Sequence, residues 1–89
     1  RRGRKGRTGY RSQDVGVEMH LTRIDVPNNM RRFYRMEIVE GLFGEWSLVR
    51  EWGRIGQAGQ VRIDWFEDEG DAKDARFDIL MQKAKRGYE

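Results

Sequence analysis

The stretch that decides the fold is Trp46-Ser47-Leu48-Val49-Arg50-Glu51-Trp52-Gly53-Arg54-Ile55-Gly56, followed by Gly59 and then Gln60-Val61-Arg62-Ile63-Asp64-Trp65-Phe66. The apolar run over residues 46–52 predicts a strand. Residues 53–59 predict a sharp connection, because glycine tolerates backbone conformations that other residues avoid. Residues 60–66 alternate and predict the next strand. Since Leu48 and Val49 are neighbours and both apolar, the pattern leaves open which face of the first strand is buried.

Two further strands are predicted before this hairpin. His20–Val26 predicts a short strand with an irregularity, which Pro27 ends. Residues 32–40 are rich in aromatic and branched side chains and predict a second strand, and residues 41–44 predict the turn that follows it. Short connections of this kind are typical of an antiparallel meander.

The last element is predicted to be an amphipathic helix. Acidic residues crowd its beginning and basic residues its end, which suits the helix dipole, and Gly87 is a natural stop. Apolar residues recur at helical spacing and predict a stripe that faces the core: Phe77, Leu80, Met81 and Ala84, widened by Ala72, Ala75 and Ile79. The predicted fold class is α+β, a small antiparallel meander sheet with one C-terminal amphipathic helix packed on one face.

Charge divides the chain into two parts. Among its 89 residues, positions 1–12 carry six arginines and lysines and no acid, a charge of +6. The remaining 12 basic and 15 acidic residues sum to −3, so the total of +3 comes from the tail. We expect residues 1–18 to form a disordered, Arg- and Gly-rich tail, because they hold too little apolar surface to offset the entropy of ordering, and residues 19–89 to form the domain. Any site for a polyanion on this domain must be a local patch.

Several classes of site are excluded or disfavoured by composition. The absence of cysteine excludes disulfides, thiolate catalysis and cysteine-based zinc sites. His20 is the only histidine, so one chain cannot assemble a histidine-based metal site or a Ser-His triad. The acidic cluster at residues 67–74 lacks the order of a calcium loop. We therefore expect no enzyme, no metal and no cofactor. No apolar run reaches membrane-spanning length and no signal peptide is visible, so a cytoplasmic protein with no membrane partner is expected.

The candidate binding site is the motif Trp52-Gly53-Arg54. It places a flat ring and a permanent cation two residues apart, beside glycines that admit a ligand closely, and such a spot suits a nucleotide or a phosphate. A buried tryptophan before a hairpin turn is the structural alternative. Arg31 and Arg32 are neighbours at a strand start and point to opposite faces, so at most one of them shares a surface with Trp52.

With these motifs in place, residues from about Leu21 to Tyr88 resemble the WGR domain, named after its Trp-Gly-Arg motif. The resemblance includes Asn29 before a basic-aromatic segment, the strand that leads into the motif, residues 55–60 after it, and a closing helix. It implies an antiparallel sheet with a helix packed on it. With nothing else attached, we expect a small stand-alone bacterial member.

The resemblance also implies a function. In eukaryotic poly(ADP-ribose) polymerases the domain reads DNA breaks: the motif tryptophan stacks on a terminal sugar, and the arginine contacts phosphate and relays binding to the catalytic part. Carried over, Trp52 would stack, Arg54 would contact phosphate, and Gly53 would complete the motif. Asn29, Arg31 and Arg32 would lie at the matching edge of the preceding strand. No catalytic or zinc-finger domain is present to receive a relay, so binding of DNA ends or breaks is the expected function. A protein-interaction module with no nucleic-acid role is the alternative.

Overall fold

A computed structural model of the chain describes residues 18–89. The expected tail, residues 1–18, therefore lies outside the described residues except for Glu18, with which the first strand begins. The elements follow the chain as β1 (Glu18–Asp25), a short 3-10 turn η2 (Val26–Asn28), β2 (Met30–Glu40), β3 (Trp46–Arg54), β4 (Gln60–Phe66) and α1 (Glu69–Lys85).

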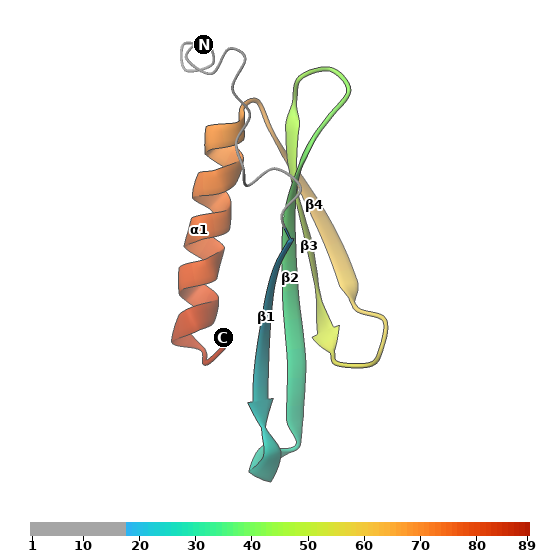
Figure 1. Ribbon diagram of the computed structural model, residues 1–89, viewed down its shortest axis with the longest axis vertical. Coiled ribbons are helices and arrows are strands. Elements are labelled where there is room, and N and C mark those ends of the chain that lie inside the picture. Colours follow the sequence, from blue (N-terminus) through green and yellow to red (C-terminus); the bar gives the residue numbers. More distant parts are fainter. Residues whose placement is uncertain (1–17) are drawn as a thin grey trace.

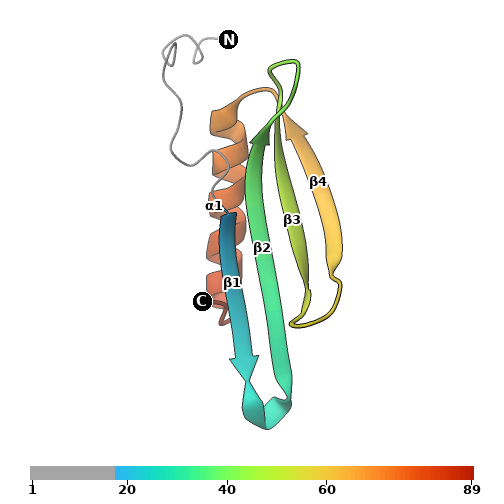
Figure 2. The same ribbon diagram turned by 45° about the vertical axis from the view of Figure 1, so that its right-hand side comes forward.

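The four strands form one antiparallel sheet in sequence order, β1-β2-β3-β4, and α1 packs on one face of it (Figure 1, Figure 2). This is the α+β meander with a C-terminal helix that the sequence predicts. The helix starts beside the end of β4 and ends near β1 and β2, where the backbone N–H of Glu89 donates to the carbonyl of Thr22 at 2.8 Å. α1 therefore packs against β2, β3 and β4.

The register of β2 against β3 answers which face of β3 is buried. Ile38 pairs with Leu48, and Tyr34 pairs with Trp52. Side chains of directly paired residues lie on the same face. These residues face α1, and the buried core is formed by Tyr34, Met36, Ile38, Trp46, Leu48 and Ala72. Val49, the apolar neighbour of Leu48, therefore lies on the opposite face.

The ends of α1 agree with the prediction. The Asp68 side chain caps the helix by accepting a hydrogen bond from the backbone N–H of Asp71 at 2.9 Å. Acidic residues occupy the first turn, basic residues occupy the last, and Gly87 follows with a φ of 94°. The described part of the chain has no helix with the length and apolar character needed to cross a membrane.

The predicted apolar stripe of the helix is partly wrong. Ala72, Ala75, Ile79 and Leu80 pack into the core as expected, but Phe77, Met81 and Ala84 are exposed. These three residues lie at the margin of the seven-residue stripe, where the sheet does not cover them.

The faces of β4 are distributed in an unexpected way. Its apolar residues Val61, Ile63 and Trp65 are exposed on the face away from α1, whereas Arg62 and Asp64 share the helix side of the sheet. On that side, Asp64 accepts a hydrogen bond from Arg50 at 2.8 Å. This ion pair borders the core, because the Arg50 side chain is only 15% exposed and also donates to the Tyr34 hydroxyl at 3.2 Å.

Candidate nucleic-acid interface

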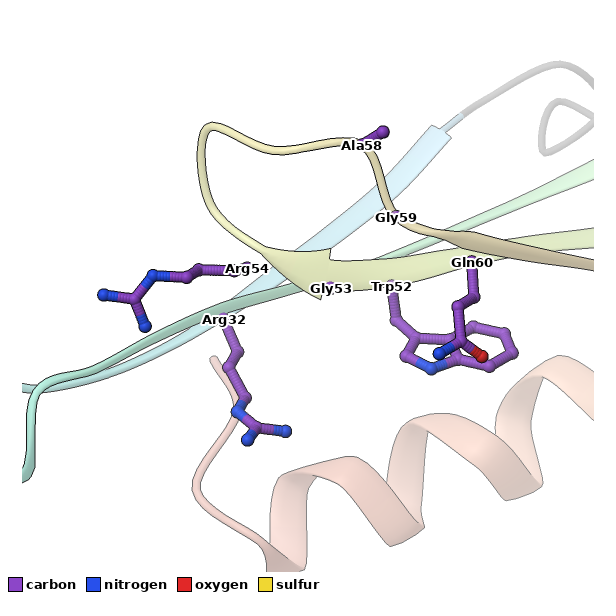
Figure 3. A pocket seen from close by; sticks show the side chains of 7 residues that line it. All are labelled: Arg32, Trp52, Gly53, Arg54, Ala58, Gly59 and Gln60. Carbon is purple, nitrogen blue, oxygen red and sulfur yellow. The ribbon is translucent and has the colours of Figure 1, made fainter.

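A pocket of about 330 Å³ opens where β3 ends and β4 begins. Figure 3 shows Arg32, Trp52 and Gln60 extending from the sheet toward α1, with Trp52 and Gln60 side by side, whereas Arg54 extends away from Trp52 past the end of β3. The lining residues are Arg32, Trp52, Gly53, Arg54, Ala58, Gly59 and Gln60. This set contains an aromatic ring, two guanidinium groups and a side-chain amide, and no carboxylate.

The Trp52 side chain contacts both the hydrophobic core and the pocket. Its ring stacks on Tyr34 with 5.6 Å between ring centroids and an angle of 16° between their planes. The side chain is partly buried against the core and also lines the pocket. The indole is therefore held firmly by the fold and is still within reach of a ligand, which is the arrangement that a stacking platform requires.

Arg54 is exposed at the end of β3, and Asn29 helps to position it. The Arg54 guanidinium donates to the backbone carbonyl of Asn29 at 3.4 Å and to its Oδ1 at 3.5 Å. Asn29 adopts the left-handed conformation, with φ 53° and ψ 40°, at the end of η2. Asparagine tolerates that conformation well. The predicted site residue Asn29 thus supports Arg54 and does not itself line the pocket.

Arg31 and Arg32 lie on opposite faces, as the sequence predicts. Arg32 pairs with Arg54 across β2 and β3, on the side of the sheet that carries Trp52, and it lines the pocket. Arg31 has the other orientation, and its backbone carbonyl accepts a hydrogen bond from the N–H of Ile55 at 3.0 Å. Of the two, only Arg32 belongs to the site.

Gly53 and Gly59 shape the pocket wall by close backbone packing. A Cβ atom added to Gly53 would lie 3.0 Å from the Cα of Gly59. A Cβ added to Gly59 would collide with the carbonyl of Trp52 and come within 2.9 Å of the Phe33 ring. Gly53 therefore has a structural role in the motif, because it allows the two ends of the β3–β4 connection to approach each other.

This close approach predicts that Gly59→Ala destabilises the protein by about 1–3 kcal/mol, since backbone atoms must move to admit the methyl group. The matched control is Gly70→Ala in the first turn of α1, where the added atom meets nothing closer than 3.5 Å. The control is expected to be neutral or stabilising by up to about 1 kcal/mol. Urea unfolding of both variants measures the difference. Equal stability of the two would contradict the packing described for the hairpin.

Two groups near the pocket carry no sequence signal that would identify them. Gln60 pairs with Trp52 across β3 and β4 and lines the pocket, which only the strand register brings about. Lys83 reaches back from α1, with its Nζ 4.4 Å from the centre of the Tyr34 ring. Burial lowers the pKa of Lys83, and the positive charges of Arg86 and Arg50 lower it further. Positive charge is thus concentrated on this side of the sheet.

No carboxylate among the described residues lines the pocket, although Asp25 lies on the same face at the end of β1 and Glu89 lies beside Thr22. Within residues 18–89, no carboxylate forms an ion pair with Arg32 or Arg54. The acidic first turn of α1 lies at the opposite end of the sheet, after β4. No group of three or more histidine, aspartate or glutamate residues in the described part of the chain is arranged to hold a metal ion. The pocket is therefore a local basic site on an acidic body.

Comparisons with known proteins agree with this layout. The WGR domain family matches residues 17–89, which is most of the chain. The uncharacterized protein y4dW of Sinorhizobium fredii is 46% identical over 70 residues, which cover 79% of this chain and 34% of that protein. The chain thus spans about a third of the length of this relative. No solved structure matches the chain. The protein belongs to the WGR domain family.

Proposed function

We propose that this protein binds the end of a DNA strand in the pocket formed by Arg32, Trp52 and Arg54. The observation that supports this most strongly is the Trp52 ring, which is anchored on Tyr34 and lines a pocket that holds two arginines and no acid. In this assignment Trp52 stacks on a terminal sugar or base, and the two guanidinium groups contact phosphate. The role is binding without catalysis, and the wider WGR family supports a nucleic-acid ligand.

An end is favoured over continuous duplex for a geometric reason. Inside a duplex, neighbouring base pairs cover the faces of each base, so an indole has no face to stack on. A terminus or a break exposes such a face together with a phosphate. A pocket of about 330 Å³ is at the small end of the range for ligand sites, which suits a terminal nucleotide better than a longer segment.

Arg32 and Arg31 provide a matched test of the phosphate contact. Each phosphate contact contributes about 0.9 to the slope of log affinity against log salt concentration for duplex DNA. Arg32→Ala is therefore expected to flatten the slope by about 1 and to weaken binding of all sequences similarly. Arg31→Ala removes the same charge one residue away, on the opposite face, and is expected to leave the slope nearly unchanged.

Fluorescence anisotropy with a labelled blunt duplex at several salt concentrations gives both slopes. The arginines of residues 1–12 add their own salt dependence, and this cancels in the difference between the two variants. Equal slopes for Arg31→Ala and Arg32→Ala would show that total charge, and not the pocket, determines binding.

A protein-interaction module is the second candidate, and the exposed apolar face of β4 favours it. Val61, Ile63 and Trp65 offer a surface suited to a protein partner. A complex that is insensitive to salt, together with no DNA affinity at moderate salt, would select this function over DNA-end binding.

A further inference from the structure

The outer face of β4 is apolar and lies at an open edge of the sheet. Val61, Ile63 and Trp65 are 59%, 49% and 60% exposed, and nothing among residues 18–89 packs over them. β4 is also the last strand in the order β1-β2-β3-β4, so within the described structure its outer backbone groups have no strand partner. An edge strand with such a face is a template for pairing with another strand.

β4 carries the charged residues Arg62 and Asp64 on its helix side, but it lacks other usual protections of an edge strand. Residues 60–66 contain neither proline nor lysine, and the strand pairs with β3 through seven consecutive registered positions without a bulge. The other edge of the sheet differs, because the C-terminal Glu89 donates its backbone N–H to the Thr22 carbonyl of β1. The two edges are therefore not equivalent, and β4 is the one that is open along its length.

The sequence of β4 is complementary to itself when it is read in the antiparallel direction about Ile63. With Ile63 opposite its own copy, Arg62 lies opposite Asp64 and Val61 lies opposite Trp65. Opposite charges and aromatic–branched pairs directly across from each other stabilise antiparallel strands. The Arg62 side chain is 63% exposed, and its Nε lies 3.1 Å from the Asp64 carboxylate of its own strand.

From this register we propose that two copies of the chain associate through antiparallel pairing of β4 with β4, with a two-fold axis at Ile63. Side chains directly opposite each other in an antiparallel pair lie on the same face, so the axis runs perpendicular to the sheet. The two four-stranded sheets join into one continuous sheet, and each copy's Val61 packs beside the other's Trp65. Both helices lie on one face, and the two Trp52 pockets open at opposite ends of the dimer.

Position 63 gives a direct test, because on a two-fold axis a residue meets only its own copy. Wild-type protein is expected to dimerise weakly, with a dissociation constant between about 10 μM and 1 mM, as suits a small transient interface. Ile63→Lys and Ile63→Glu each place like charges across the axis and are expected to weaken association by about tenfold or more. An equimolar mixture of the two variants pairs opposite charges and is expected to dimerise again. Sedimentation equilibrium of the full chain measures all four samples.

Val39→Lys is the control for packing of one sheet face on another. Val39 is exposed on the same outer face but lies on β2, away from the edge. It is expected to leave dimerisation unchanged, and thermal melts followed by circular dichroism check that every variant folds. A wild-type protein that stays monomeric at about 1 mM, or a mixture that fails to regain the dimer, would overturn the proposal. Loss of the dimer in Val39→Lys would also overturn it, in favour of face-to-face stacking.

Discussion

Trp52→Leu is expected to weaken binding of a blunt or nicked DNA duplex by about 1–3 kcal/mol, a loss of roughly 5- to 150-fold in affinity. The reason is that leucine is apolar but has no flat face on which a terminal sugar or base can stack. Leucine also keeps part of the contact with Tyr34, on which the indole rests at a centroid distance of 5.6 Å. Affinity is measured by fluorescence anisotropy at one fixed salt concentration.

The control for this change is Trp65→Leu. Trp65 is 60% exposed on the opposite face of the sheet and lies outside the pocket. Trp65 is the same residue type as Trp52 and is more exposed. Trp65→Leu therefore also removes any non-specific contribution that a surface tryptophan makes to binding. Equal losses in the two variants would contradict a site at Trp52. Both comparisons are repeated on protein that lacks residues 1–17, because a segment with six basic residues binds polyanions by charge alone.

Leu48→Ala is expected to lower the free energy of unfolding by about 2–5 kcal/mol. Leu48 is completely buried between β3 and α1, so the substitution removes buried methyl groups and leaves a cavity. In a domain of this size each kcal/mol lost lowers the melting temperature by about 4–8 °C. The expected decrease is therefore large enough to unfold much of the protein at 37 °C if its wild-type stability is only about 5 kcal/mol.

The same substitution at Leu42 is the matched control. Leu42 lies in the turn between β2 and β3 and is 93% exposed, so Leu42→Ala is expected to change stability by less than about 0.5 kcal/mol. Val49 lies on the other face of β3, and Val49→Ala is expected to lower the free energy of unfolding by an amount between those of Leu42→Ala and Leu48→Ala. Urea unfolding curves rank the three variants. A loss at Val49 larger than that at Leu48 would mean that the strand buries its other face.

Most of the fold follows from local sequence signals. The glycine-rich turn and the alternation in residues 60–66 predict the β3–β4 hairpin, and the acidic and basic residues predict where α1 begins and ends. The buried face of β3 does not follow from sequence, because Leu48 and Val49 are adjacent and equally apolar. Only the pairing of Leu48 with Ile38, which α1 covers, distinguishes them.

The helix and β4 show why periodicity alone is insufficient. Phe77 and Met81 have the correct spacing for the core, but they lie at the margin of the helix face that packs on the sheet and remain exposed. Val61 and Ile63 alternate as a buried face would, but they lie on the side of the sheet that no described element covers. In both cases the pattern identifies the element, and the position of its neighbours determines which face is buried.

The candidate site was predictable in part. The motif and the opposite orientations of Arg31 and Arg32 follow from residue types and strand geometry. Gln60 lines the pocket because the register of β3 against β4 pairs it with Trp52, and no local sequence signal predicts that register. The support that Asn29 gives to Arg54 depends on a hydrogen bond across 25 residues of sequence.

The most direct test of the central claim is a titration of isotope-labelled protein with a DNA duplex, monitored by nuclear magnetic resonance. It compares a duplex with a free end against the same sequence closed at both ends by covalent loops. With the open duplex, we expect the indole N–H of Trp52 and the guanidinium N–H groups of Arg32 and Arg54 to shift strongly while Trp65 does not. With the closed duplex, the Trp52 shift is expected to be lost. Equal responses to the two duplexes, or shifts confined to residues 1–17, would contradict recognition of a DNA end by this pocket.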